Sequence, residues 1–151
     1  MRCIKLTLAY DGTAYLGWQR QAKGKTIQGV LEEALTQITG SSCRIVASGR
    51  TDAGVHALGQ VVAVWMEHHL PVSVLQKALN AVIPADIVVL AAEEMEPTFH
   101  PIRDAKRKRY RYYLWDAPTR PVFWRHYVWH FWHRLDCDKM QQAAQYLIGQ
   151  H

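Results

Sequence analysis

The stretch SGRTDAGVHA, residues 48–57, places an arginine and an aspartate two positions apart, at Arg50 and Asp52. Gly49 and Gly54 flank them, and glycine adopts backbone angles that side chains forbid, so the loop can lift the carboxylate into a cleft. A guanidinium this close can bind a carboxylate or a phosphate bidentately and favour the ionised acid at neutral pH. An ionised Asp52 can act as a nucleophile or a general base. The alternative is a plain turn in which the Asp side chain caps the backbone and pairs with Arg50 at the surface.

A second stretch, KRKRYRYYLW at residues 106–115, has five basic residues in its first six positions. As part of a strand over 105–116, it places Lys106, Lys108 and Tyr110 on one face. Basic and aromatic side chains in alternation suit contacts to phosphates and stacking on bases. A charged edge strand that resists aggregation is the alternative.

Hydrophobic periodicity predicts the elements that position these stretches. Period-two alternation and apolar runs predict strands at 2–10, 43–48, 59–67 and 86–94. Helical spacing predicts one helix from Thr26 to Gly40 and a second from a Ser73–Gln76 capping box to Pro84, with Leu75, Leu79 and Val82 on its inner face. The order β-α-β-β-α-β is that of ferredoxin-like folds, which RNA-recognition domains share.

Beyond this unit we expect additional antiparallel strands at 105–116 and 126–133. A C-terminal helix is predicted at 138–148, with Met140, Ala143, Ala144 and Leu147 facing inward. The sequence therefore predicts an α+β fold, ferredoxin-like or RRM-like, forming a single domain over residues 1–151.

Composition and charge indicate a soluble protein with a polyanionic partner. No apolar run approaches the roughly 20 residues of a membrane helix, and the formal net charge is +5. Three dispersed cysteines without a C-x-x-C motif indicate reduced thiols and a cytoplasmic location. We expect no metal site, because an extended strand would point His126 and His130 away from His133, and zinc needs convergent ligands.

SGRTDAGVHA resembles the signature of bacterial tRNA pseudouridine synthases of the A type, which isomerise uridines in the anticodon arm of tRNA. Four further stretches stand in the same order as that family's own blocks: YDGTAYLGWQRQ (10–21), TIQGVLEEAL, ALNAVIPADI (78–87) and FHPIRDAKRKRYRYYL (99–114). The resemblance covers essentially the whole chain but only the family's N-terminal half. It implies half of the pseudouridine synthase fold, with a C-terminal half that would follow the closing GQH.

The resemblance also implies roles for individual residues. Asp52 would be the catalytic residue, Arg50 would displace the target base and hold the RNA backbone, and Tyr110 would pack against the uracil. A homodimer binding the tRNA anticodon stem-loop across both subunits is implied, without a membrane partner. Further possible RNA contacts are Gln19, Arg20, Lys106, Lys108 and His56. A turn packed under Trp18 explains Gln19 and Arg20 equally well, and a lone histidine such as His56 is more often a packing or hydrogen-bonding residue.

The chemistry implied here needs no metal or cofactor. The base must leave the stack, its glycosidic bond must break, and the ring must rotate before C5 bonds to the sugar. Asp52 can attack C1′ or take a proton from C2′, and the sequence leaves both routes open. Residues 1–151 alone are expected to be inactive, because the family pairs its Asp with a basic residue from the other half. The alternatives are a non-catalytic RRM-like RNA-binding module, although 59–67 lacks the spaced aromatics of such modules, and a structural dimerisation domain.

Overall fold

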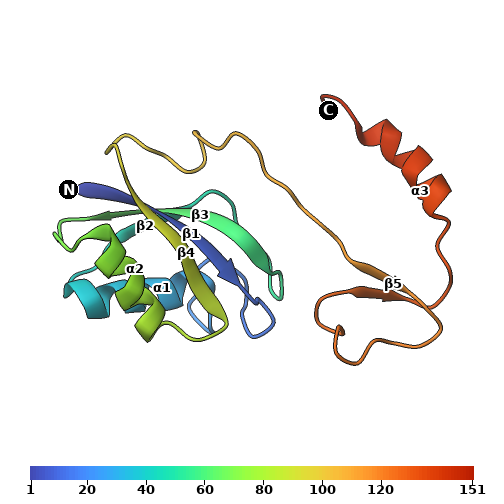
Figure 1. Ribbon diagram of the computed structural model, residues 1–151, viewed down its shortest axis with the longest axis horizontal. Helices are drawn as coiled ribbons and strands as arrows, with labels where there is room; N and C mark the ends of the chain where they lie inside the picture. The colour runs from blue at the N-terminus through green and yellow to red at the C-terminus, as the bar shows by residue number, and fades with distance from the viewer. The chain divides into compact units, whose positions relative to one another are not determined.

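The computed structural model describes all residues, Met1–His151, and they form two compact units, Met1–Arg107 and Lys108–His151. The first unit holds a four-stranded sheet with two helices on one of its faces (Figure 1). The second unit holds two short strands and one further helix. None of the helices combines the length and the apolar content needed to cross a membrane.

The elements of the first unit follow the predicted order, and each predicted boundary shifts by no more than about two residues. They are β1 Arg2–Tyr10, α1 Ile27–Thr39, β2 Arg44–Ala47, β3 Ala57–Met66, α2 Val72–Val82 and β4 Ile87–Met95. The strands lie in the order β2-β3-β1-β4, and every pair of neighbours is antiparallel. The α+β class predicted from the sequence is therefore confirmed.

The core of this unit follows from the alternation along β1. Ile4, Leu6 and Leu8 are fully buried, and they face the apolar side of α1 at Leu31 and Leu35. Burying each such side chain contributes about 1.5–3 kcal/mol. The sheet can therefore serve as a rigid base for the loops at its ends.

Helix α1 begins and ends where its capping residues predict. The hydroxyl oxygen of Thr26 accepts a hydrogen bond from the backbone N–H of Gly29 at 3.2 Å. Gly40 ends the helix with a φ of 72°, a conformation that glycine adopts without strain. Both signals are local in the sequence, and both predictions are confirmed.

The exposed edge of β4 is closed by side chains from α2. The amide of Asn80 donates to the carbonyl oxygen of Val89 at 3.0 Å and accepts from the N–H of Val89 at 2.8 Å. Gln76 donates to the carbonyl oxygens of Val89 and Leu90, at 3.1 and 3.0 Å. These bonds satisfy backbone groups that an edge strand otherwise leaves open to another chain.

The predicted capping box of α2 is wrong, because Gln76 is engaged at β4. The helix begins after Pro71 with no side-chain cap, and the N–H groups of Val74 and Leu75 both donate to the Pro71 carbonyl. Its inner face contains Leu75 and Leu79 as predicted, but Val82 is exposed.

We expect Asn80→Ala to lower the free energy of unfolding by about 1–3 kcal/mol, because it leaves the N–H of Val89 without a partner. Denaturant unfolding of the full-length protein measures this change. The control is Gln37→Ala, which removes an amide side chain from the exposed face of α1 and should change stability by less than about 0.5 kcal/mol. Equal effects of the two substitutions would contradict the assigned role of Asn80.

The second unit differs from the sequence prediction in its strands. It contains β5 Leu114–Asp116 and β6 Trp129–Phe131, which pair in parallel. The long strand predicted over 105–116 is therefore wrong except for its last three residues, and so is the antiparallel pairing. A strand forms only where it has a partner, and residues 105–113 carry charges on both faces and have no pairing strand.

Helix α3, Cys137–Ala144, and the 3-10 turn Gln145–Leu147 stand close to the predicted helix over 138–148. Asp136 caps α3 by accepting from the N–H of Lys139 at 3.0 Å, which lowers the pKa of the Asp136 carboxyl. The side chains predicted to face inward are not buried, Met140 and Leu147 among them. Nothing in this unit covers the apolar face of the helix.

Candidate active site

The Arg-Asp loop, residues 48–56, connects β2 to β3 at the end of the sheet where β1 finishes. Its first residues are tied to β3. Ser48 donates its N–H to the carbonyl of Val61 at 2.8 Å and its hydroxyl to Gln60 at 3.0 Å. The amide of Gln60 in turn donates to the carbonyl of Gly49 at 2.5 Å. The loop therefore leaves the sheet in a fixed direction.

The centre of the loop is held by the segment between β1 and α1, which we term the seating segment, residues 11–26. The N–H of Trp18 donates to the carbonyl of Thr51 at 2.9 Å, and the N–H of Gly54 donates to the carbonyl of Tyr15 at 3.2 Å. A bond of 3.2 Å from the N–H of Val55 to the carbonyl of Asp52 closes the turn. Three backbone bonds thus fix the residues on both sides of Asp52.

Two glycines of the seating segment allow this close approach. A methyl group at Gly12 would collide with the carbonyl oxygen of Val55. A methyl group at Gly17 would lie 2.5 Å from the carbonyl oxygen of Thr51, and Gly17 has a φ of +90°. Both positions therefore require glycine for the loop to stay in place.

Tyr15 anchors the seating segment to the residue before β4. It is buried, and its hydroxyl donates to the carboxylate of Asp86 at 2.5 Å. Burial, together with the neighbouring Asp86, raises the pKa of Tyr15 well above its usual value, so the hydroxyl keeps its proton. The N–H of Asp11 also bonds the Asp86 carbonyl, at 2.9 Å, which joins the segment to the residue before β4.

His56 ties the end of the loop to the same segment. Its Nδ1 lies 3.1 Å from the N–H of Gly12 and 3.0 Å from a carboxylate oxygen of Asp11. Nδ1 accepts from Gly12 when it carries no proton and donates to Asp11 when it does, so the two contacts belong to different proton positions. In either form His56 anchors the loop, which agrees with the packing interpretation of this residue.

Asp52 and Arg50 are both exposed. Within the first unit the Asp52 carboxylate and the Arg50 guanidinium form no hydrogen bond or ion pair, with each other or with neighbours. The structure therefore has neither the capping turn nor the surface ion pair of the alternative interpretation. A rigid backbone that presents an uncommitted acid and an uncommitted guanidinium is an arrangement suited to an external ligand.

The two candidate RNA-contact residues of the seating segment, Gln19 and Arg20, bond other residues of the chain. Gln19 donates to Gln28 at 2.8 Å, and Arg20 forms a 2.6 Å ion pair with Glu32 on α1. The neighbouring Trp18 is buried, with 2% of its surface exposed. These contacts fit the interpretation of a turn packed around Trp18.

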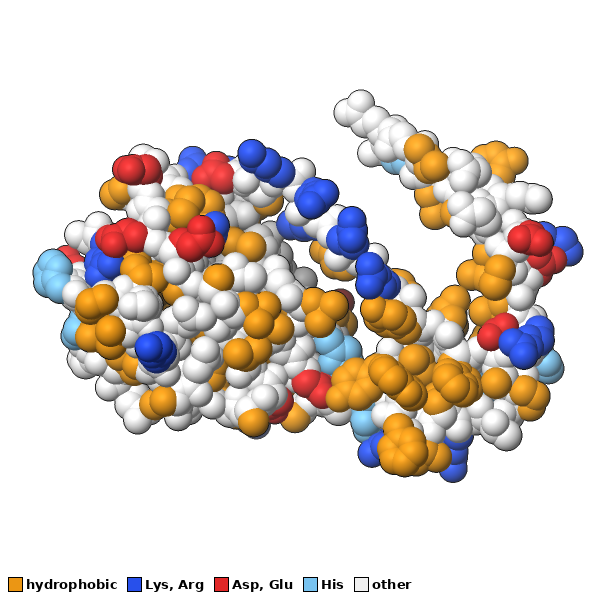
Figure 2. Space-filling model, viewed as in Figure 1, with side chains coloured by type: hydrophobic (Ala, Val, Ile, Leu, Met, Phe, Trp, Pro, Cys, Tyr) orange, Lys and Arg blue, Asp and Glu red, His pale blue; other side chains and the backbone are white.

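Other candidate residues lie along the basic stretch. Lys106, Lys108 and Tyr110 are exposed, and Tyr110 has 75% of its surface accessible. Figure 2 shows Lys and Arg side chains following one another along an extended part of the chain. Arg50, Asp52 and His56 share one loop of the first unit, whereas Tyr110 belongs to the second.

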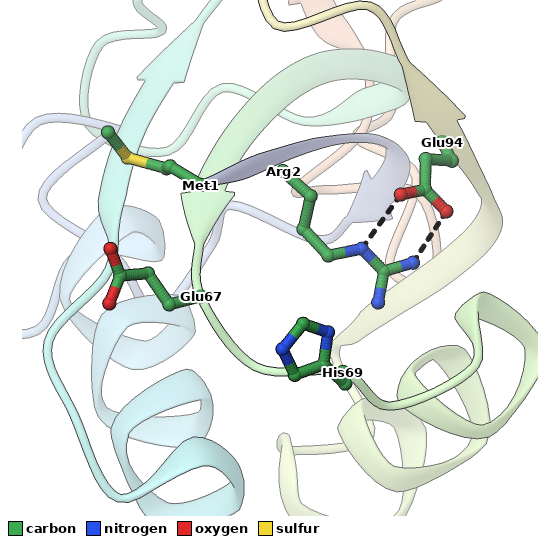
Figure 3. A pocket seen from close by; sticks show the side chains of 5 residues that line it. All are labelled: Met1, Arg2, Glu67, His69 and Glu94. Carbon is green, nitrogen blue, oxygen red and sulfur yellow. Dashed lines mark hydrogen bonds and ion pairs between the residues drawn. The ribbon is translucent and has the colours of Figure 1, made fainter.

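A hollow at the other end of the sheet is unrelated to this loop (Figure 3). It is lined by Met1, Arg2, Glu67, His69 and Glu94. Strand β1 separates it from the Arg-Asp loop by about 25 Å, at about 3.3 Å per residue. Arg2 is already occupied there, because it forms two bonds to Glu94 and further bonds to the carbonyls of His68 and Leu70. Its role is to hold the strand ends together.

Comparison with known proteins assigns the chain to a class of RNA-modifying enzymes. The family described as tRNA pseudouridine synthase matches residues 7–102, and the chain belongs to this family. The tRNA pseudouridine synthase A of Moorella thermoacetica is 49% identical over 153 residues, and that of Pelobacter propionicus is 46% identical over 151 residues. Each alignment covers 100% of this chain and 62% of the relative, so the chain spans about three-fifths of their length.

Proposed function

We propose that the full-length protein isomerises uridine to pseudouridine in the anticodon stem-loop of tRNA, with Asp52 as the catalytic residue. The observation that carries this proposal is the Asp52 carboxylate, which is exposed and unpaired on a loop whose backbone is fixed on both sides. Family membership and the names of the relatives support the same reaction. The chain would form half of the pseudouridine synthase fold.

Asp52 acts on the sugar of the target nucleotide, either at C1′ as a nucleophile or at C2′ as a base. Its rigid support favours both routes, because a group held near its reacting atom avoids the entropy cost of finding it. The bond between C1′ and N1 of the uracil breaks, the ring rotates while it is still bound, and C5 bonds to C1′ and then loses its proton. No residue here needs a metal ion for these steps.

Arg50 and Tyr110 handle the RNA. Arg50 has no partner within its unit, so its guanidinium is available to a phosphate or to the space left by the displaced base. Tyr110 offers an exposed ring on which the uracil can stack, an interaction of about 1–3 kcal/mol per base. Lys106 and Lys108, which stand close to Tyr110 in the sequence, attract the phosphate backbone of the RNA. Gln19 and Arg20 are exposed, and the Arg20 guanidinium keeps donors that its bond to Glu32 does not use.

The protein acts as a homodimer in the cytoplasm under this proposal. Cys3, Cys43 and Cys137 are free thiols, which agrees with a reducing compartment. Large apolar side chains of the second unit are exposed, including Phe123 at 88% and Tyr146 at 84%. Exposed apolar area of this kind fits contact with another part of a longer chain or with a second subunit.

Tritium release tests the function directly. When C5 of uridine bonds to the sugar, its hydrogen leaves, so a tRNA transcript labelled with tritium at C5 of uridine should release label with the full-length protein. A transcript whose anticodon-arm uridines are replaced by cytidine is the control and should release none. Release from both transcripts would reject the proposed site, and release from neither would reject the proposed reaction.

The chain of residues 1–151 is expected to release no tritium above background in the same assay. In residues 1–151 the loop supplies an acid and a guanidinium. The apolar side chains of the second unit, however, remain uncovered. Turnover by residues 1–151 at the rate of the full-length protein would contradict this expectation.

A further inference from the structure

A buried tyrosine hydroxyl contacts the residue next to the catalytic acid. Tyr10 is the last residue of β1 and is 4% exposed, and its ring packs in the core 6.4 Å from the ring of Trp18, measured between centroids. The Tyr10 hydroxyl lies 2.9 Å from the hydroxyl of Thr51. A phenylalanine would fill the same apolar volume, so the core itself has no need of the hydroxyl.

Thr51 is therefore held at two points. Its carbonyl accepts from the N–H of Trp18 at 2.9 Å, and its side chain bonds Tyr10. The side chains immediately before and after it, Arg50 and Asp52, are the exposed and unpaired ones. Fixing both the carbonyl and the side chain of Thr51 restricts rotation of the backbone that carries Asp52.

The environment keeps the Tyr10 contact intact. Burial raises the pKa of the Tyr10 hydroxyl, so it remains protonated and able to donate. The Gln60 side chain holds the carbonyl of Gly49 at 2.5 Å. Gln60 and Tyr10 thus fix the loop on both sides of Arg50.

We propose that Tyr10 is a positioning residue, whose hydroxyl orients Asp52 through Thr51. This inference rests on the proposed function and adds to it the contact that orients the catalytic acid. Tyr10 touches no reacting atom. It acts by removing conformations of residues 50–52 in which the carboxylate is misplaced.

Tyr10→Phe in the full-length protein tests the inference. We expect the single-turnover rate of tritium release to fall by about 10- to 100-fold, since a displacement of about 1 Å in a reacting group has effects of this size. The Kd for tRNA should stay within about twofold, because no RNA contact is removed. Thr51→Val should reproduce this result, and Thr51→Ser, which keeps the hydroxyl, should retain most of the rate.

The double variant Tyr10→Phe, Thr51→Val should be no slower than either single variant, because the two substitutions remove the same hydrogen bond. Multiplying losses would overturn the inference, and so would an unchanged rate in Tyr10→Phe. Asn80→Ala, which leaves the N–H of Val89 on β4 without a partner, is the control and should lower stability without lowering the rate of the folded protein.

Amide hydrogen exchange separates failure of this inference from failure of the proposed function. Tyr10→Phe should accelerate exchange at the N–H groups of Gly54 and Val55, which bond the carbonyls of Tyr15 and Asp52. If this acceleration occurs in a protein that releases no tritium, the positioning contact is supported and the proposed reaction is rejected. Unchanged exchange in Tyr10→Phe overturns the inference, whatever the activity.

Discussion

Asp52→Asn in the full-length protein is expected to lower uridine isomerisation by roughly 10³-fold or more, the scale found when a reacting group is removed. The amide has the shape of the carboxylate but neither attacks C1′ nor accepts a proton from C2′. The Asp52 side chain has no partner within its unit, so the substitution should change stability by less than about 0.5 kcal/mol. Single-turnover tritium release and equilibrium tRNA binding measure the two properties separately.

The control for Asp52→Asn is Asp138→Asn, which removes the same charge from an exposed position in the first turn of α3. It should leave the rate unchanged. If the protein is an enzyme, Asp52→Asn loses turnover and keeps its tRNA affinity. If it is an RNA-binding module of the RRM type, the substitution leaves tRNA affinity unchanged and there is no turnover to lose. Full turnover in Asp52→Asn would therefore remove Asp52 from the mechanism.

Gly17→Ala is expected to lower the free energy of unfolding by about 3 kcal/mol or more and to reduce turnover. Alanine at a φ of +90° costs about 1–2 kcal/mol in backbone strain. Its methyl group would also lie 2.5 Å from the carbonyl oxygen of Thr51 and 3.0 Å from the carbonyl carbon of Asp52. The chain can relieve this overlap only by moving the backbone that carries the acid.

Gly40→Ala is the matched control, because Gly40 also has a positive φ, +72°, but a methyl group there meets nothing within 4 Å. It should show the strain alone, about 1–2 kcal/mol, with normal turnover by the folded protein. Denaturant unfolding and single-turnover rates compare the two variants. Equal losses of stability and rate in both would mean that the contact with Thr51 has no effect.

The parts of the fold that sequence predicts well depend on neighbouring residues. The buried alternation of Ile4, Leu6 and Leu8 identifies β1, and Thr26 and Gly40 mark the ends of α1, because these signals act within one element. A local signal was wrong where a distant group bonds the same side chain. Gln76 was predicted to cap its own helix, but it bonds the edge of β4, 13 residues further along the chain.

The second unit shows the same limit. Residues 105–113 have the alternation of a strand, yet pairing begins only near Tyr113, whose carbonyl accepts from the N–H of Trp129 at 2.7 Å. The residues that connect β5 to β6 contain Pro118 and Pro121, and the two strands run in the same direction. Alternation along one strand carries no information on which direction its partner takes.

The candidate site also has residues that the sequence identifies and residues that only the fold reveals. The sequence identifies Arg50 and Asp52, because an acid and a guanidinium among glycines are unusual in a connecting loop. It does not identify the residues that seat this loop, which are Tyr10, Gly12, Tyr15 and Gly17. The two glycines of YDGTAYLGW were the available signal, but only the fold shows which backbone they face.

The contact between Gly12 and Val55 restricts sequence variation at one of the two positions but not at the other. Gly12 is pressed against the carbonyl oxygen of Val55, an atom that every amino acid supplies. The side chain of Val55 itself is 41% exposed. Position 55 can therefore accept many residue types, whereas position 12 admits one, so a residue's tolerance to mutation here depends on which side of the contact it occupies.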